Sequence, residues 1–335
     1  MKPDVATRGS IDWILIAKGI GIILVVIGHF EPHASPAYWS ETRRIIYTFH
    51  MPLFFMLSGY LYVHGKYSYV ELIHNKVQRL LYPFFAIAAA YYPIKYLAGN
   101  VIHVDYPVNA TSILALFSNP VNSYAPLLWF IQALFLIFVI YPLAKLFLSD
   151  LAILLVLLAI NEVFGSKYPF FGNALAYMPF FTVGVMVRQS AGSSADQIPT
   201  RWTYLVASLV IFTSGCYLEF SGATSFEVGY AFKCLLGVMG SLFIINLSHA
   251  IARLERSKIR NALIQMGVYS MTIYLFHPIF ESAVRVGFAQ LKHWDAPFEL
   301  VALIAIGVGV GVPMVLEREV LRRYWVTRKF ILGLT

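Results

Sequence analysis

The stretch IAKGIGIILVVIGHF, residues 16–30, places a lysine and a histidine inside an otherwise apolar segment. The apolar run begins at Ile11 and ends at Phe30, which is long enough for one helix to cross a bilayer. Burying Lys18 or His29 there without a partner costs several kcal/mol. The run contains a charged side chain and no small-x-small cleavage site, so it is predicted to be a retained first span. We therefore expect the fold or the chemistry of this protein to offset the cost of burying Lys18 and His29.

The rest of the chain has the same character. Of its 335 residues, 59% are hydrophobic and only 13% are charged, whereas a soluble domain carries about 25% charged residues. Ten apolar runs predict an all-α polytopic membrane protein, with residues 1–335 as a single transmembrane domain and no appended soluble domain. The runs cover residues 11–30, 45–63, 79–98, 126–147, 150–164, 172–188, 202–219, 228–249, 264–286 and 298–316.

The basic residues set the orientation. Seventeen of the 25 Lys and Arg residues lie in segments on the same side as the N-terminus, and five lie on the other side. This bias predicts that both termini are cytoplasmic. The net charge of +8 then reflects topology and contact with an anionic lipid bilayer, and no nucleic-acid module is present. Cys216 and Cys234 both lie in apolar runs, which excludes a disulfide framework and a CxxC metal site.

Three histidines are expected at one depth near the outer face. At a rise of 1.5 Å per residue, His29 lies about 27 Å from the inner end of its helix. His50 lies about 9 Å below the outer end of the next helix. His277 is 13 residues into the run 264–286, about 20 Å up. Each alone can be a structural hydrogen-bond donor, but their convergence favours a shared chamber.

Other polar groups are placed around that chamber. Glu281 and Arg285 follow His277 at i+4 and i+8, on the same face of the helix. They can line the chamber or form an interfacial ion pair. Lys233 enters its helix from the outer end.

The inner end of the molecule is predicted to be cationic. Lys18 lies 11 residues, about 16 Å, below His29 on nearly the same face. Lys76 and Arg79 mark the cytoplasmic entry of the run 79–98. These side chains can also be anchors that snorkel to the interface.

Several motifs together resemble a known family. They are AKGIGIILVVIGH (17–29), FHMPLFFMLSGYLY (49–62), KVQRLLYPFF (76–85), PLLWFIQALF (126–135), MPFFTVGVMV (178–187) and YSMTIYLFHPIF (269–280). In this order they resemble acyltransferase family 3, and the chain is similar to its fucose 4-O-acetylase-like branch of bacterial O-acetyltransferases. Two positions depart from the family: Lys18 stands where Arg is frequent, and Leu15 where related sequences often carry an acid. Asp12 lies one turn below but on a different face.

The resemblance implies an enzyme of the bacterial inner membrane that uses acyl-CoA, usually acetyl-CoA, without a metal. Its acceptor would be a hydroxyl of a carbohydrate, such as an exopolysaccharide, an O-antigen or a lipid-linked sugar. Lys76, Arg79 and Lys18 suit the phosphates of CoA.

In this reading His29 is the general base or the nucleophile. His277, oriented by Glu281, would position the acceptor or stabilise the oxyanion. The remaining chamber residues are His50, Lys233 and Arg285.

Two other classes of protein compete with this interpretation. A transporter or flippase would also place ionisable groups in a membrane lumen, but the sequence shows no inverted repeat and only Glu281 as a deep carboxylate. A structural scaffold leaves the buried pair of Lys18 and His29 without a purpose. Transfer of label from acyl-CoA to an acceptor separates the enzyme from both.

Overall fold

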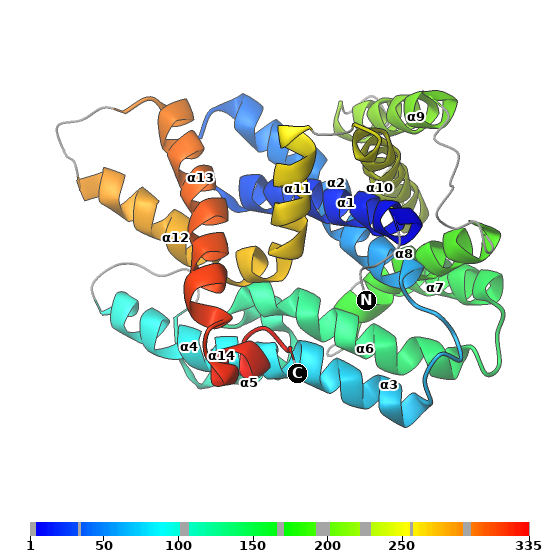
Figure 1. Ribbon diagram of the computed structural model, residues 1–335, viewed down its shortest axis with the longest axis horizontal. Coiled ribbons are helices and arrows are strands. Elements are labelled where there is room, and N and C mark those ends of the chain that lie inside the picture. The colour runs from blue at the N-terminus through cyan, green and yellow to red at the C-terminus, as the bar shows by residue number, and fades with distance from the viewer. Residues whose placement is uncertain are drawn as a thin grey trace. The chain divides into compact units, whose positions relative to one another are not determined.

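The computed structural model describes residues 5–32, 35–100, 107–165, 171–191, 202–221, 229–254, 257–290 and 296–334, and every regular element in these ranges is a helix (Figure 1). Five helical segments are long and apolar enough to cross a membrane: Asp12–His29, Pro126–Ala144, Trp202–Phe220, Tyr230–Ala252 and Phe298–Leu321. A sixth is reached if the bent pair Lys258–Val268 and Ser270–Phe288 counts as one span. The protein is an all-α polytopic membrane protein, and the count of ten spans stays a prediction.

The elements have the following bounds in chain order. The α-helices are α1 (Val5–His29), α2 (Ala37–Tyr60), α3 (Tyr69–Lys76), α4 (Tyr82–Gly99), α5 (Ala110–Ser118), α6 (Trp129–Ala144), α7 (Asp150–Phe164), α8 (Gly172–Ala191), α9 (Trp202–Phe220), α10 (Tyr230–Ala252), α11 (Lys258–Val268), α12 (Ser270–Gln290), α13 (Phe298–Leu316) and α14 (Trp325–Phe330). Two π-helical segments, η1 (Val77–Leu81) and η5 (Glu317–Leu321), and two 3-10 turns, η2 (Pro120–Asn122) and η3 (Pro126–Leu128), complete the set.

The chain forms two compact units. The first comprises residues 1–61 and 183–317, and the second comprises residues 62–182 and 318–335. In the first unit α1 packs against α2, α10, α11 and α12, while α12 also packs along α13. The single domain over residues 1–335 stays a prediction.

Helices α1 and α11 approach each other backbone to backbone. A Cβ added to Gly19 would collide with the carbonyl group of Leu263, and one added to Gly267 would collide with that of Leu15. Only glycine allows this distance, because any larger residue would push the two helices apart. The close contact holds α11 against the part of α1 around Leu15 and Gly19.

Helix α12 starts after a sharp break, which corrects the sequence prediction of one helix over residues 264–286. α11 and α12 are bent by 82° at Tyr269, whose φ of −91° and ψ of 6° leave the helical region. His277 therefore lies seven residues after Ser270, about 10 Å along α12, rather than 13 residues along a straight span. The predicted position of His277 along one straight helix was therefore wrong, because α11, which packs against α1, runs in a different direction from α12.

The start of the third predicted span also differs from the prediction of a helix over residues 79–98. Residues of α3 lead into the π-helical segment η1, and α4 follows directly. Arg79 lies inside η1 rather than at the start of a regular α-helix. π-Helical turns are rare in proteins, and those that occur are often found at functional sites.

Candidate active site

Three imidazoles from three helices meet in the first unit. The ring centroid of His29, at the end of α1, is 6.2 Å from that of His50 in α2 and 5.3 Å from that of His277 in α12. Both neighbours lie edge-on to His29, and both are fully buried. His29 is half-buried. It is therefore the central member of this imidazole cluster, which we define as His29, His50 and His277.

The backbone fixes the proton on Nδ1 in the first two rings. His29 Nδ1 lies 2.8 Å from the carbonyl oxygen of Val25, and His50 Nδ1 lies 2.8 Å from that of Ile46. A carbonyl oxygen only accepts, so Nδ1–H donates in both cases. The lone pair of each neutral ring is then on Nε2, which is the atom that can take a proton or attack a carbon.

His277 is held in the same way, with help from the next residue. Its Nδ1 atom lies 3.0 Å from the carbonyl oxygen of Ile273 and 2.9 Å from that of Tyr274, and it donates its hydrogen to them. Pro278 has no N–H, so it cannot make the helical bond to Tyr274, and the imidazole takes that carbonyl instead. The His-Pro dipeptide is a sequence signal for this orientation.

The Nε2 atoms of the cluster have no hydrogen-bond partner among the described residues. Those of His50 and His277 are buried as well. Leaving a buried acceptor unsatisfied costs about 1–3 kcal/mol. The unsatisfied Nε2 atoms of His50 and His277 can therefore accept hydrogen bonds from a donor that reaches them.

Tyr47 is a fourth ring at this site that the sequence reasoning missed. Its ring centroid is 5.8 Å from that of His29 and 4.9 Å from that of His50. Arg43 lies one turn earlier, with its guanidinium carbon 5.8 Å from the Tyr47 centroid. Arg43, Tyr47 and His50 are spaced i, i+4 and i+7 on α2, so helical periodicity alone groups them.

No hydrogen bond joins Glu281 to His277 among the described residues, and the orienting role expected from its i+4 spacing stays a prediction. His277 uses its own helix carbonyls, and Glu281 Oε1 is buried without a hydrogen-bond partner in the described structure. The Glu281 side chain lies instead against Gly309 of α13, where an added Cβ would be 3.1 Å from its Cγ. Glu281 and Arg285 also form no ion pair among the described residues, since Arg285 donates to the carbonyl oxygen of Glu31 at 3.0 Å.

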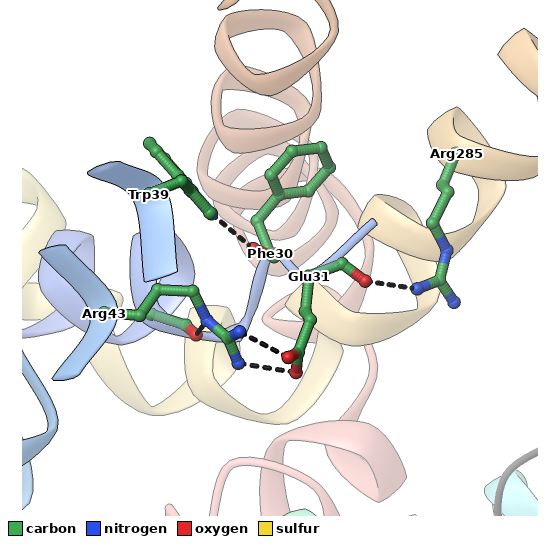
Figure 2. Close-up of polar contacts among 6 residues, drawn as sticks. Phe30, Glu31, Trp39, Arg43 and Arg285 are labelled. Atoms are coloured by element: carbon green, nitrogen blue, oxygen red, sulfur yellow. Dashed lines mark hydrogen bonds and ion pairs between the residues drawn. The ribbon is translucent and has the colours of Figure 1, made fainter. Parts of the chain in front are cut away.

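Side chains from α2 and α12 grip the chain on both sides of His29 (Figure 2). Arg43 donates from Nε to the Gly28 carbonyl at 2.7 Å, and its two terminal nitrogens contact the Glu31 carboxylate at 2.5 and 2.6 Å. The hydrogen bond from Arg43 holds the pKa of Glu31 below its usual 4.5. Because the pKa of Glu31 is lower in the folded protein, its ion pair contributes full stability above about pH 4.5. This stability is lost as the pH falls through the lowered pKa of the folded state. The pair is thus intact throughout the range in which an imidazole titrates.

A second pair of contacts completes this grip. Trp39 Nε1–H donates to the Phe30 carbonyl at 2.8 Å, and Arg285 donates to the Glu31 carbonyl (Figure 2). We call the three donors Arg43, Trp39 and Arg285 the clamp.

Lys18 and Lys233 occupy different surroundings. Lys18 is half-buried on α1 and makes no hydrogen bond or ion pair with the described residues. Asp12 pairs with Arg260 of α11. Lys233 is exposed in the first turn of α10, and no described contact joins it to the imidazole cluster.

Lys76 and Arg79 belong to the second unit. Lys76 Nζ, in the last turn of α3, lies 3.6 Å from the ring centroid of Phe138. Such cation–π contact holds an ammonium group against an apolar helix. Arg79 is exposed, and Gly333 packs on its backbone with a φ of 61°. Within the described ranges no group of three or more His, Cys, Asp or Glu residues is arranged to hold a metal ion.

Comparison with known proteins identifies the family. The family model described as an acyltransferase domain, Acyl_transf_3, matches residues 11–318. The chain is 26% identical over 326 residues to nodulation protein NolL of Sinorhizobium fredii, covering 88% of this chain and 84% of that protein. It is 28% identical over 217 residues to NolL of Mesorhizobium japonicum, covering 62% of this chain and 54% of that protein. No solved structure matches the chain. The match over residues 11–318 contains the whole imidazole cluster and its clamp, and this integral membrane protein therefore belongs to acyltransferase family 3.

Proposed function

We propose that the protein is an O-acyltransferase that moves an acyl group, in the first place acetyl, from cytoplasmic acyl-CoA to a hydroxyl of a cell-surface or exported carbohydrate. The observation that carries the proposal is the imidazole cluster of a chain in a family of acyltransferases: the ring of His29 lies beside two buried rings whose Nε2 atoms have no hydrogen-bond partner in the described structure. A bacterial inner membrane is the location that fits such a substrate pair.

The chemistry needs one proton transfer that His29 can perform. As general base, its Nε2 takes the proton of the acceptor hydroxyl while that oxygen attacks the thioester carbonyl. The tetrahedral intermediate then expels the CoA thiolate, which receives the proton from the imidazolium. As nucleophile, Nε2 attacks the thioester carbonyl and expels the CoA thiolate, which gives an acyl-imidazolium. The acceptor hydroxyl then attacks that acyl group, the imidazole leaves with the hydroxyl proton, and this proton passes to the thiolate.

The flanking histidines suit acceptor binding rather than oxyanion stabilisation. With the proton on Nδ1, the Nε2 atoms of His50 and His277 accept hydrogen bonds and cannot donate them. Hydroxyl groups of a sugar are donors that fill such positions. Of the two roles expected for His277, the structure thus favours positioning the acceptor.

The donor needs cations for its phosphates, and Lys76, Arg79 and Lys18 remain the proposed set. Replacing Arg79 with glutamine is expected to raise KM for acetyl-CoA about tenfold and leave kcat within twofold, because a charged hydrogen bond contributes about 1.5–3 kcal/mol. Lys66→Gln removes a cation that lies beside Tyr67, 5.3 Å from its ring, and serves as the matched control. Equal effects of the two substitutions on KM would mean that Arg79 contributes only positive charge and makes no specific contact with the phosphates.

Transfer of label tests the proposal against the transporter. The purified protein in lipid nanodiscs is given acetyl-CoA labelled in the acetyl group, with and without a pool of bacterial surface glycans. We expect free CoA thiol and labelled glycan in equal amounts over many turnovers, and no turnover without the acceptor. A protein that binds glycans but leaves acetyl-CoA intact would overturn the enzyme and favour transport.

A further inference from the structure

The helices that bring His50 and His277 to His29 also bring an arginine each to the end of α1. Arg43 precedes His50 by seven residues on α2, and Arg285 follows His277 by eight on α12. Seven or eight residues are about two turns, so each arginine shares a helix face with its histidine. The elements that build the imidazole cluster are thereby the same elements that build the clamp.

The clamp satisfies backbone groups that a helix end leaves open. The last carbonyls of an α-helix have no partner within the helix. At the end of α1 the carbonyls of Gly28, Phe30 and Glu31 each accept a side-chain hydrogen bond from another helix (Figure 2). These residues stand immediately before and after His29. The backbone that carries the imidazole is therefore held on both sides.

Arg43 has a geometry that no other residue can reproduce. Its Nε–H binds Gly28 while its two terminal nitrogens hold the Glu31 carboxylate, and its side chain is only 14% exposed. A lysine offers one point charge in place of the planar fork, so it can satisfy one of these partners but not both at once.

Resting on the proposed function for its kinetic consequence, we infer that Arg43 is a positioning residue for His29. By fixing Gly28 and Glu31 it sets the direction of the imidazole toward His277 and His50, and so the place of the Nε2 lone pair. Misplacing a reacting group by about 1 Å can cost about 100-fold in rate. Arg43 itself need not touch the acyl group or the acceptor.

The test compares Arg43→Lys and Arg43→Gln with Arg44→Gln in the full-length protein in nanodiscs. Arg44 is the next residue of α2, pairs with Glu41 on the same helix, and is half exposed. Its removal deletes the same charge without touching α1. Glu31→Gln weakens the fork from the other side and serves as a second variant should Arg43→Gln fail to fold.

The first measurement is the ¹⁵N spectrum of labelled imidazoles, which needs no substrate. We expect the His29 signals of Arg43→Lys and Glu31→Gln to shift or split as the backbone beside His29 loses its fixed position, with Arg44→Gln unchanged from wild type. Unchanged His29 signals in both clamp variants would overturn the inference, whether or not the protein transfers acyl groups.

The second measurement is kinetic. Arg43→Lys is expected to lower kcat about tenfold with KM for acetyl-CoA unchanged and with unfolding at the wild-type temperature. A loss of kcat equal to that of Arg44→Gln, or one matched by a lower unfolding temperature, would leave Arg43 with a structural role only and overturn the inference. No transfer by the wild type would instead refute the proposed function and leave the spectral result to decide on Arg43.

Discussion

Replacing His29 with glutamine is expected to lower kcat for acyl transfer by about 10³-fold, within the range that general base catalysis contributes. Glutamine fills much of the same volume, but its side chain has no basic nitrogen to take the proton of the acceptor or to carry an acyl group. The release of CoA thiol measures the loss. KM for acetyl-CoA should change little, because the change removes a reacting group rather than a phosphate contact.

His249→Gln is the matched control for that experiment. His249 is also a buried histidine of the first unit, on α10, where it stacks on Trp13 with ring centroids 4.3 Å apart. Trp13 precedes His29 by 16 residues of α1, about 24 Å. A variant at His249 should retain wild-type kcat in the folded fraction. If His29→Gln keeps more than a tenth of the activity, the general base lies elsewhere.

Replacing Gly267 with alanine is expected to destabilise the first unit strongly. The new Cβ would overlap the carbonyl of Leu15, and neither backbone can yield without separating α1 from α11. Overpacking of this kind costs about 3 kcal/mol. Thermal unfolding in detergent, followed by the loss of helical circular dichroism, should show a clearly lower midpoint.

Gly287 and Gly307 give the controls for this prediction. Both lie in helices, α12 and α13, and a Cβ added to either meets no atom within 4 Å. Alanine there should stabilise slightly, because glycine costs about 0.5–1 kcal/mol relative to alanine inside a helix. A midpoint of Gly267→Ala at or above that of the two controls would contradict the close packing of α1 and α11.

The positions of several helices were predictable from hydropathy, but the positions of the breaks between helices were not. The predicted run 150–164 coincides with α7, and 298–316 coincides with α13, since apolar length is the dominant signal in a membrane. The 82° bend at Tyr269 has no proline at the break, and Gly267 gives its only hint. Contact between α11 and α1 decides it, and such tertiary contact is invisible in a single sequence.

The site was predictable in part for a similar reason. The assumption of straight helices over the apolar runs placed His29 and His50 at one depth; their ring centroids lie 6.2 Å apart, although α2 begins at Ala37, 13 residues before His50. It failed for His277, whose helix begins late, although the ring does lie beside His29. Helical spacing contained enough information to find Tyr47 and Arg43 on the face of His50. The clamp on Gly28 and Glu31 was not predictable, because backbone carbonyls carry no sequence signature.

The central claim is that Nε2 of His29 meets the acyl group of acyl-CoA, and alkylation by bromoacetyl-CoA tests it most directly. In this analogue the imidazole nitrogen displaces bromide and forms a stable C–N bond. Mass spectrometry of the protein from nanodiscs should find one adduct, on His29, and excess acetyl-CoA should prevent it. An enzyme that binds acetyl-CoA yet is alkylated only at another residue, or not at all, would contradict the assignment of His29.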